Sequence, residues 1–364
     1  MKLRFIDSIR GIAILMVILI HTSQKITLGF IPEILTQYGQ MGVQLFFMAS
    51  AYTLCLSTSK RSNESRSTLK FAIRRYFRIA PVYYLGIILY FFVFLFYNKL
   101  KFGHFIISES YNFTNLFCNL TFIHGFYPPA NNNIVPGGWS IGTEMAFYAI
   151  FPLLYKISQS QLKSIKDIAL FIVFGIVFSQ LILFTLHLNG HSIMNDNFLY
   201  YNMINQLPVF FLGIGFYYKN NLTDWSGNWL FNILFFILFS FISILIWHSG
   251  NDYYFSITPI ISGFSFIFLM QLFQKYDFIN TKLLVRIGQL SYSMYILHFI
   301  FANYIKGLFM HKFENFNGFF SLIFFYVFTV FFTFISALLF EKYVEKPSIE
   351  LGRFYINKLD AKNS

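Results

Sequence analysis

Arg10-Gly-Ile-Ala-Ile-Leu-Met-Val-Ile-Leu-Ile-His21 is an apolar run of ten residues closed at each end by an ionisable side chain. Lys2 and Arg4 precede the run, an order that resembles a signal peptide. The residues that follow, His-Thr-Ser-Gln-Lys at 21–25, contain no small-x-small cleavage site. We therefore expect an uncleaved first transmembrane helix here.

The same apolar character extends over all 364 residues. Apolar residues make up 56% of the chain and charged residues only 12%, against about 25% charged in an average soluble protein. The 52 phenylalanines and the mean hydropathy of +0.58 indicate lipid as the solvent. A bilayer core about 30 Å thick needs about 20 apolar residues per helix. We therefore expect an all-α polytopic membrane protein with about ten transmembrane helices.

The expected spans are residues 9–29, 38–57, 78–97, 137–155, 168–188, 199–218, 229–248, 254–273, 287–309 and 318–341. The stretch 113–124 is apolar but too short to cross, and we interpret it as a re-entrant or interfacial segment. The division expected is a transmembrane domain over residues 1–347 and a short cytoplasmic tail over residues 348–364.

The charge distribution predicts the orientation of the chain. Lys and Arg number 27 and Asp and Glu number 15, which gives a net charge of +12. Of the 27 basic residues, 22 fall in alternate segments between the expected spans, beginning with the N-terminus and ending with the tail. Because basic residues stay in the cytoplasm, both termini are expected there. The positive charge then reflects topology, and no nucleic-acid partner is expected.

Two cysteines, Cys55 and Cys118, are too few for a disulfide framework or a four-thiolate site, so no metal is expected. The first functional candidates are instead the ionisable residues that lie within expected spans, because such groups are costly in lipid. Arg10 and His21 lie 11 positions apart, close to three helical turns, and so share a helix face. The alternative for His21 is a structural hydrogen bond to a neighbouring helix.

Arginines gather just before Pro81. Arg75 and Arg78 are three residues apart and Arg74 and Arg78 four, so they share a helix face. Guanidinium groups bind phosphate in a bidentate fork, so the cluster predicts a polyphosphate clamp. The alternative is ordinary anchoring to lipid headgroups.

Two further segments carry polar groups at helical spacing. Ser140, Glu144 and Tyr148 form one stripe after Trp139, where the alternative for the carboxylate is a structural ion pair. A second set, Ser291, Tyr295 and His298, also shares a helix face. The alternative for this set is hydrogen-bonded helix packing, which accounts for the Ser and the Tyr and less well for the His. A His-x4-Asp pattern at 191–196 lies in a short outward loop, and we give it little weight.

Together these motifs resemble the membrane-bound acyltransferase 3 family. They are Arg10 to His21, Arg75-x-x-Arg78, Trp139-Ser140-x-x-x-Glu144-x-x-Phe147-Tyr148, Ser291-Tyr292-Ser293-x-Tyr295-x-x-His298 and Phe340-Glu341-x-x-x-Glu345-Lys346-Pro347. They follow the family's order over nearly the whole chain. Departures are Ala49-Ser50-Ala51-Tyr52, where a Ser-Gly-(Phe/Tyr) turn is common, and Met145, where a second Glu is frequent.

The resemblance implies an O-acyltransferase, most often an O-acetyltransferase, of the cytoplasmic (inner) membrane. Such an enzyme moves an acyl group from cytoplasmic acyl-CoA to a hydroxyl of a cell-surface polysaccharide such as O-antigen or capsule, or of a lipid-linked saccharide. No tightly bound cofactor is implied, and acetyl-CoA is a co-substrate. The partners expected are acyl-CoA, the glycan acceptor and membrane lipids.

A histidine suits this chemistry because its pKa of about 6.5 lies near neutrality. We expect His21 to be the general base and Glu144 to orient the acceptor or the imidazole. Direct transfer and an acyl-histidine intermediate both remain open. Arg10, Arg75 and Arg78 are expected to hold the phosphates of the donor. The residues expected to line the site are Trp139, Ser140, Tyr148, Ser291, Tyr295 and His298. The rival class is a polytopic carrier or flippase for a lipid-linked saccharide, although no paired broken helices support it.

Overall fold

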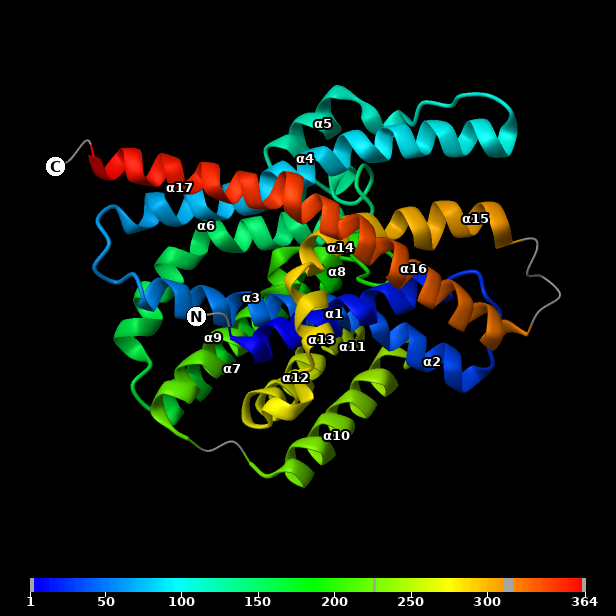
Figure 1. Cartoon of the computed structure of the whole chain (residues 1–364). Helices are drawn as coiled ribbons and strands as arrows, with labels where there is room; N and C mark the ends of the chain where they lie inside the picture. The colour runs from blue at the N-terminus through cyan, green and yellow to red at the C-terminus, as the bar shows by residue number, and fades with distance from the viewer. Residues whose placement is uncertain (1–2, 225–226, 311–316, 362–364) are drawn as a thin grey trace. The chain divides into compact units, whose positions relative to one another are not determined.

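The computed structural model describes residues 3–224, 227–310 and 317–361 (Figure 1). Within these ranges the regular elements are helices of the α, 3-10 and π types, and no strand occurs. Apart from their end turns, helices satisfy their backbone hydrogen bonds internally, which is the requirement for crossing a lipid core. The expected all-α class is therefore correct.

Two compact units make up the chain, and each is described separately. The first unit consists of residues up to Ala13, Met41–Asn63 and Thr143–Gln289, and the second of Ile14–Gln40, Glu64–Gly142 and the residues from Leu290 onward. Helices α1 (Arg4–Ser23) and α6 (Gly138–Gln161) contribute residues to both.

The first unit is a bundle in which α9 packs against α3, α7 and α12, and α10 packs against α12. Its elements are α3 (Gly42–Ser59), α7 (Ile165–Leu188), α8 (Asn197–Tyr201), α9 (Met203–Leu222), α10 (Trp229–Trp247), α11 (Asp252–Phe255), α12 (Thr258–Lys275), η5 (Asp277–Ile279) and α13 (Lys282–Gln289). Glycine allows close approach, because a Cβ at Gly213 of α9 would lie 2.7 Å from the Met48 carbonyl oxygen of α3.

In the second unit α4 (Ser67–Phe102) packs against α14 (Ser291–Phe299) and the C-terminal helix α17 (Lys346–Ala361), which runs alongside it in Figure 1. Helix α4 continues through Pro81. The other elements are α2 (Phe30–Tyr38), η1 (Gly39–Met41), η2 (Glu109–Tyr111), α5 (Phe113–Leu120), η3 (Ile123–Gly125), η4 (Pro128–Ala130), η6 (Ile300–Ile305), α15 (Lys306–Phe309), α16 (Gly318–Phe340) and η8 (Glu341–Glu345).

Capping side chains define where several long helices begin. The side chains of Ser164, Asn202, Asn228 and Asn317 accept backbone N–H bonds at the first turns of α7, α9, α10 and α16. Serine and asparagine favour this position because their oxygens pair donors that the first turn leaves unsatisfied.

Seven helices of the described residues are long and apolar enough to cross a membrane, and an eighth is counted if the bent pair Lys282–Gln289 and Ser291–Phe309 forms one span. Each of the ten expected windows overlaps a helix. Helices α6 and α9 have 24 and 20 residues but are not among the apolar ones, because polar residues interrupt them. The chain is polytopic, whereas the count of ten and the orientation of the termini stay predictions.

The region between α4 and α6 is organised around buried polar groups. Tyr83 donates a 2.6 Å hydrogen bond to the Asn119 side chain, and Nε2 of the fully buried His124 lies 3.1 Å from the Gly138 carbonyl. Gly125 packs directly against Gly142, where a Cβ on either residue would lie within 2.8 Å of the other's backbone. These contacts hold the segment 103–137 against the first turn of α6. The expected short segment at 113–124 contains the eight-residue helix α5.

Candidate active site

Helix α1 carries His21 in its last turn, with Gln24 directly beyond the helix end. The Gln24 side chain is placed to hydrogen-bond the imidazole. The buried ammonium group of Lys306 donates to the carbonyl oxygens of Thr22 at 2.8 Å and Gln24 at 2.7 Å, and approaches that of His21 at 3.5 Å. A cation here neutralises the partial negative charge at the C-terminal end of the helix. Lys306 therefore fixes the backbone that carries the candidate base.

His298 is the neighbour of His21 in the second unit. The two imidazole centroids lie 5.3 Å apart, and the Phe299 ring lies 4.2 Å from each of them. Nδ1 of the fully buried His298 lies 2.6 Å from the Tyr295 carbonyl oxygen, which can only accept. In the neutral ring the proton is therefore on Nδ1, and Nε2 presents a lone pair.

Within the described part of the chain, each ring of this pair has one buried nitrogen atom without a hydrogen bond. Among the described residues, neither Nδ1 of His21 nor Nε2 of His298 has a hydrogen-bond partner, although both atoms are buried. Buried polar atoms are nearly always paired, so an unpaired one requires an explanation, and a functional role is one such explanation. The side-chain hydrogen bond of His21 is the local one to Gln24, so within the described residues it does not join His21 to a neighbouring helix.

Tyr295 joins two of the expected site segments. Its hydroxyl accepts a 2.8 Å hydrogen bond from Ser140 and donates to the carbonyl of Gly137 at 3.1 Å. Gly137 adopts φ +78°, a conformation that favours glycine, and a Cβ there would lie 3.0 Å from the Tyr295 hydroxyl. Trp139 and Ser291 are buried in the same unit. The start of α6 is thus held one turn from His298.

Glu144 lies in the first unit and is held by hydroxyl groups. Ser50 donates to its Oε1 at 2.6 Å and Tyr148 donates to the same oxygen at 2.5 Å, while the two hydroxyls lie 3.4 Å apart. Within the described residues no cation pairs with Glu144, so the alternative of a structural ion pair is not supported. Ser50 stands in the segment that departs from the family pattern, and the sequence did not single it out for a role.

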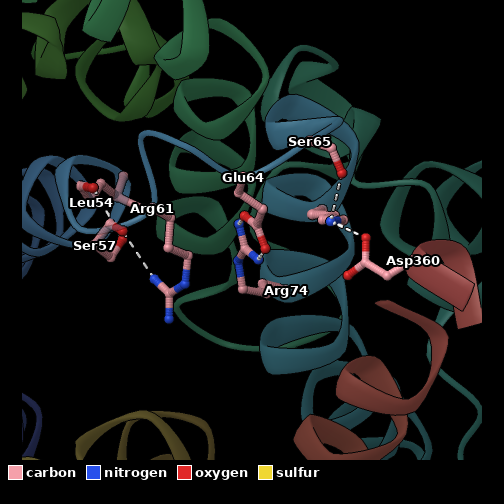
Figure 2. A network of polar contacts seen from close by, with 8 residues as sticks. Leu54, Ser57, Arg61, Glu64, Ser65, Arg74 and Asp360 are labelled. Carbon is pink, nitrogen blue, oxygen red and sulfur yellow. Dashed lines mark hydrogen bonds and ion pairs between the residues drawn. The ribbon is translucent and has the colours of Figure 1, made fainter. Parts of the chain in front are cut away.

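The arginines of α4 differ in the contacts that their side chains make. Arg74 donates two hydrogen bonds of 2.9 and 2.8 Å to the carboxylate of Glu64, and Figure 2 shows this pair. The Arg75 guanidinium lies 5.6 Å from the centre of the Phe71 ring. No hydrogen bond or ion pair to the half-buried Arg78 occurs in the described part of the chain. Glu64 therefore neutralises one member of the expected clamp, and Arg78 is the member best placed to accept a new anion.

A second ion pair holds the C-terminal helix to α4. The buried Lys70 donates to Asp360 of α17 at 2.5 Å and to the Ser65 hydroxyl at 3.3 Å. Its two partners, Asp360 and Ser65, are labelled in Figure 2. In the first unit Arg10 donates a 2.9 Å hydrogen bond to the Thr53 hydroxyl. Arg10, Glu144 and Tyr148 thus belong to the first unit and the other expected site residues to the second. A clamp that includes Arg10 stays a prediction.

Comparison with known proteins supplies the class of the chain. A family model described as an acyltransferase domain, that of acyltransferase 3, matches residues 3–341. The chain belongs to the acyltransferase 3 family. The match covers nearly all described residues and includes every expected site residue.

Two curated relatives of this acyltransferase carry acetyltransferase names. ORF330 of Acidianus two-tailed virus is 25% identical over 304 residues, which cover 81% of this chain and 82% of that protein. The peptidoglycan O-acetyltransferase OatA of Listeria monocytogenes serovar 1/2a is 29% identical over 180 residues, which are 47% of this chain and 27% of OatA. No solved structure matches the chain.

Some residues of this acyltransferase site were not identified from the sequence. Lys306 is an ionisable residue within the window 287–309, so the criterion that selected His21 applies to it as well. Gln24 and Ser50 carry no such signal, because neither is charged. The His-x4-Asp pattern has a structural explanation at one end, since the Asp196 side chain accepts the Phe198 N–H at 2.9 Å and caps α8.

Proposed function

We propose that this acyltransferase is an acetyl-CoA-dependent O-acetyltransferase of the cytoplasmic membrane, and that its acceptor is a hydroxyl of an extracytoplasmic polysaccharide such as O-antigen or capsule. Family membership and the apolar helices support a membrane acyltransferase. The observation that carries the proposal further is the pair of His21 and His298, whose unpaired nitrogens lie at the end of an apolar helix. A general base in such a position can serve a hydroxyl that arrives from one side and a thioester that arrives from the other.

In the proposed reaction His21 accepts the proton of the acceptor hydroxyl. The acceptor oxygen forms a bond to the thioester carbonyl carbon, the carbon–sulfur bond breaks, and the departing CoA thiolate takes the proton from the imidazolium. Such base catalysis contributes about 10²–10⁴-fold to the rate. Transfer through an acetyl-histidine uses the same residue and remains the alternative route.

His298 supports this step through its fixed tautomer. The Tyr295 carbonyl holds the proton on Nδ1, so Nε2 of the neutral ring accepts hydrogen bonds only. With its centroid 5.3 Å from that of His21, the ring stabilises positive charge on His21 during transfer, directly or through one water molecule.

The donor is proposed to bind through its phosphates to arginines. Arg78 carries this role most directly, because it has no carboxylate partner within the described residues, and Arg75 lies on the same helix one turn earlier. Arg10 is proposed to contribute from α1. Glu144, whose Oε1 already accepts from two hydroxyls, is proposed to orient the acceptor or the imidazole.

The test uses purified protein in detergent with acetyl-CoA radiolabelled in the acetyl group. An acetyltransferase releases free CoA slowly by hydrolysis without acceptor, and transfers label when an envelope glycan fraction is added. A carrier or flippase for a lipid-linked saccharide, the rival class, releases none. Mass spectrometry of envelope polysaccharides from cells with and without the protein then identifies the acceptor by the loss of acetyl groups.

A further inference from the structure

A cavity of about 340 Å³ opens beside the end of α1 in the second unit. Gln24 and Lys25 line it from the residues that follow α1, Tyr97 and Lys101 from the last turns of α4, and Tyr304 and Lys306 from the broken helix that carries His298. Its volume is in the lower part of the range for small-molecule sites. The proposed reaction assigns no role to this cavity.

The cavity is directly connected to the candidate base. Gln24 lines the cavity and is placed to hydrogen-bond the His21 imidazole. Lys306 lines the cavity and donates to the carbonyls of Thr22 and Gln24. A ligand in this cavity therefore lies against two residues, Gln24 and Lys306, that contact the end of α1 carrying His21.

The charged residues that line the cavity in the described part of the chain are all basic. They are three lysines, and no acidic residue lies among them. Only five of the chain's 27 basic residues fall on the side expected to face outward, and three of these five meet here. Lys306 is occupied by backbone carbonyls, whereas the exposed Lys25 has no hydrogen-bond or ion-pair partner within the described residues. Like charges in one cavity repel each other, so an anionic occupant stabilises the arrangement.

The remaining lining fits a sugar. Tyr97 and Tyr304 meet edge to face with centroids 5.3 Å apart, and the exposed amide of Asn303 lies beside them. Tyr97 also accepts a 3.2 Å hydrogen bond from Lys101, which directs the ammonium group toward the cavity wall. Asn303 and Tyr304 belong to the π-helical segment Ile300–Ile305. Such segments are rare and frequently mark functional sites.

We propose that this cavity binds the acceptor saccharide through an acidic group, a carboxylate or a phosphate, carried on the sugar next to the hydroxyl that is acetylated. The inference rests on the proposed function and narrows its substrate class to acidic glycans. Lys25 and Lys101 bind the acidic group by charge-assisted hydrogen bonds. Tyr97 and Tyr304 contact the apolar face of the ring, and the hydroxyl extends past Gln24, which lines the cavity, to the His21 imidazole.

Lysine footprinting tests the cavity without any catalytic activity. The protein is placed in phosphatidylcholine nanodiscs and treated with the N-hydroxysuccinimide ester of acetic acid, and modification of each lysine is followed by mass spectrometry. Trigalacturonate or glucose 6-phosphate is expected to slow modification of Lys25 and Lys101 at least threefold, and maltotriose at the same concentration is not. Protection by trigalacturonate alone identifies a carboxylate as the group recognised, and protection by glucose 6-phosphate alone identifies a phosphate.

Lys99 is the matched control for the footprint. It lies on the same turn of α4, donates to the Gly103 carbonyl at 2.8 Å and does not line the cavity, so its modification rate should not change. Equal protection by maltotriose, or none by either acidic probe, overturns the inference. Equal protection by phosphatidylglycerol nanodiscs without any sugar also overturns it, because the cavity is then a lipid headgroup site.

An activity measurement separates failure of this inference from failure of the proposed function. In the double variant K25Q/K101Q the ratio of acetyl transfer to acceptor-independent hydrolysis of acetyl-CoA is expected to fall at least about tenfold. The double variant K25R/K101R should restore the ratio, and K99Q should leave it unchanged. Absence of hydrolysis in the unaltered protein overturns the proposed function. Hydrolysis together with an unchanged ratio in K25Q/K101Q overturns the acidic-acceptor site alone.

Discussion

His21 and His298 come from opposite ends of the sequence, yet their imidazole centroids lie 5.3 Å apart, with the Phe299 ring 4.2 Å from each. The proton of neutral His298 is on Nδ1, because the Tyr295 carbonyl accepts it at 2.6 Å. The lone pair on Nε2 is therefore the atom through which His298 can influence His21. The two histidines are therefore expected to have different roles, and substitutions of each test them separately.

His21→Ala should lower acetyl transfer by about 10²–10⁴-fold, because it removes the proposed general base. The measurement is initial rate of label transfer to the envelope glycan fraction at matched amounts of inserted protein. His191→Ala is the matched control, since His191 is exposed in a loop and should keep normal activity. Normal transfer by well-expressed His21→Ala would refute the role of His21.

His298→Phe should lower kcat by a smaller factor, about tenfold, with little change in KM for acetyl-CoA. The reason is that Phe fills the space beside Phe299 but cannot accept a hydrogen bond. His298→Gln, which restores an acceptor, should recover part of the loss. Equal activity of the Phe variant and the unaltered protein would indicate that His298 serves packing only.

Arg78→Ala should weaken CoA binding about tenfold, because a guanidinium–phosphate contact is lost. Arg74→Ala is the internal control: Glu64 already neutralises Arg74, so its loss should change the affinity less than threefold. Calorimetric titration with CoA at two salt concentrations measures both variants. The salt dependence of the affinity should also decrease in Arg78→Ala. Unchanged CoA affinity in Arg78→Ala would show that Arg78 is only a headgroup anchor.

The segment 103–137 should lose stability as pH falls below about 6.5. Burial lowers the pKa of His124 in the folded state below its ordinary value of 6.5. Above pH 6.5 the imidazole is neutral in both states, so stability is complete. As pH falls from 6.5 toward the lowered folded-state pKa, the unfolded segment binds a proton that the folded one does not.

Hydrogen exchange of this segment at pH 7.5 and 5.5, corrected for intrinsic rates, measures the effect. His124→Gln should keep an amide near the Gly138 carbonyl and make protection independent of pH in this window. Unchanged protection of the unaltered protein at pH 5.5 would contradict the assignment.

The orientation of the chain can be tested by cysteine labelling after Cys55 and Cys118 are replaced. Ser65 and Asn132 are both exposed, so a cysteine at either position is accessible from its own side of the membrane. An impermeant thiol reagent applied to intact cells should label Asn132→Cys and spare Ser65→Cys. The reverse labelling would place the segment 98–136 beside the cytoplasmic acyl-CoA pool and leave transfer across the membrane without a basis.

Composition and spacing by themselves determined the class of this protein. An apolar fraction of 56% with 12% charged residues requires lipid as the solvent, and lipid requires helices. An ionisable group in a span is costly wherever the span packs, so His21 and His298 were identifiable from local sequence alone. The order of short motifs was enough to indicate the acyltransferase family, which the match over residues 3–341 shows.

Tertiary structure alone decided which polar groups meet. Helical periodicity places Ser140, Glu144 and Tyr148 on one stripe, but packing pairs Ser140 with Tyr295 and Glu144 with Ser50. The sequence also does not predict that Glu64 binds Arg74 or that Lys306 caps the end of α1. Periodicity describes a single helix, whereas a hydrogen bond between helices depends on their rotation and register. Those are set by the packing of many side chains together, so no short stretch of sequence contains them.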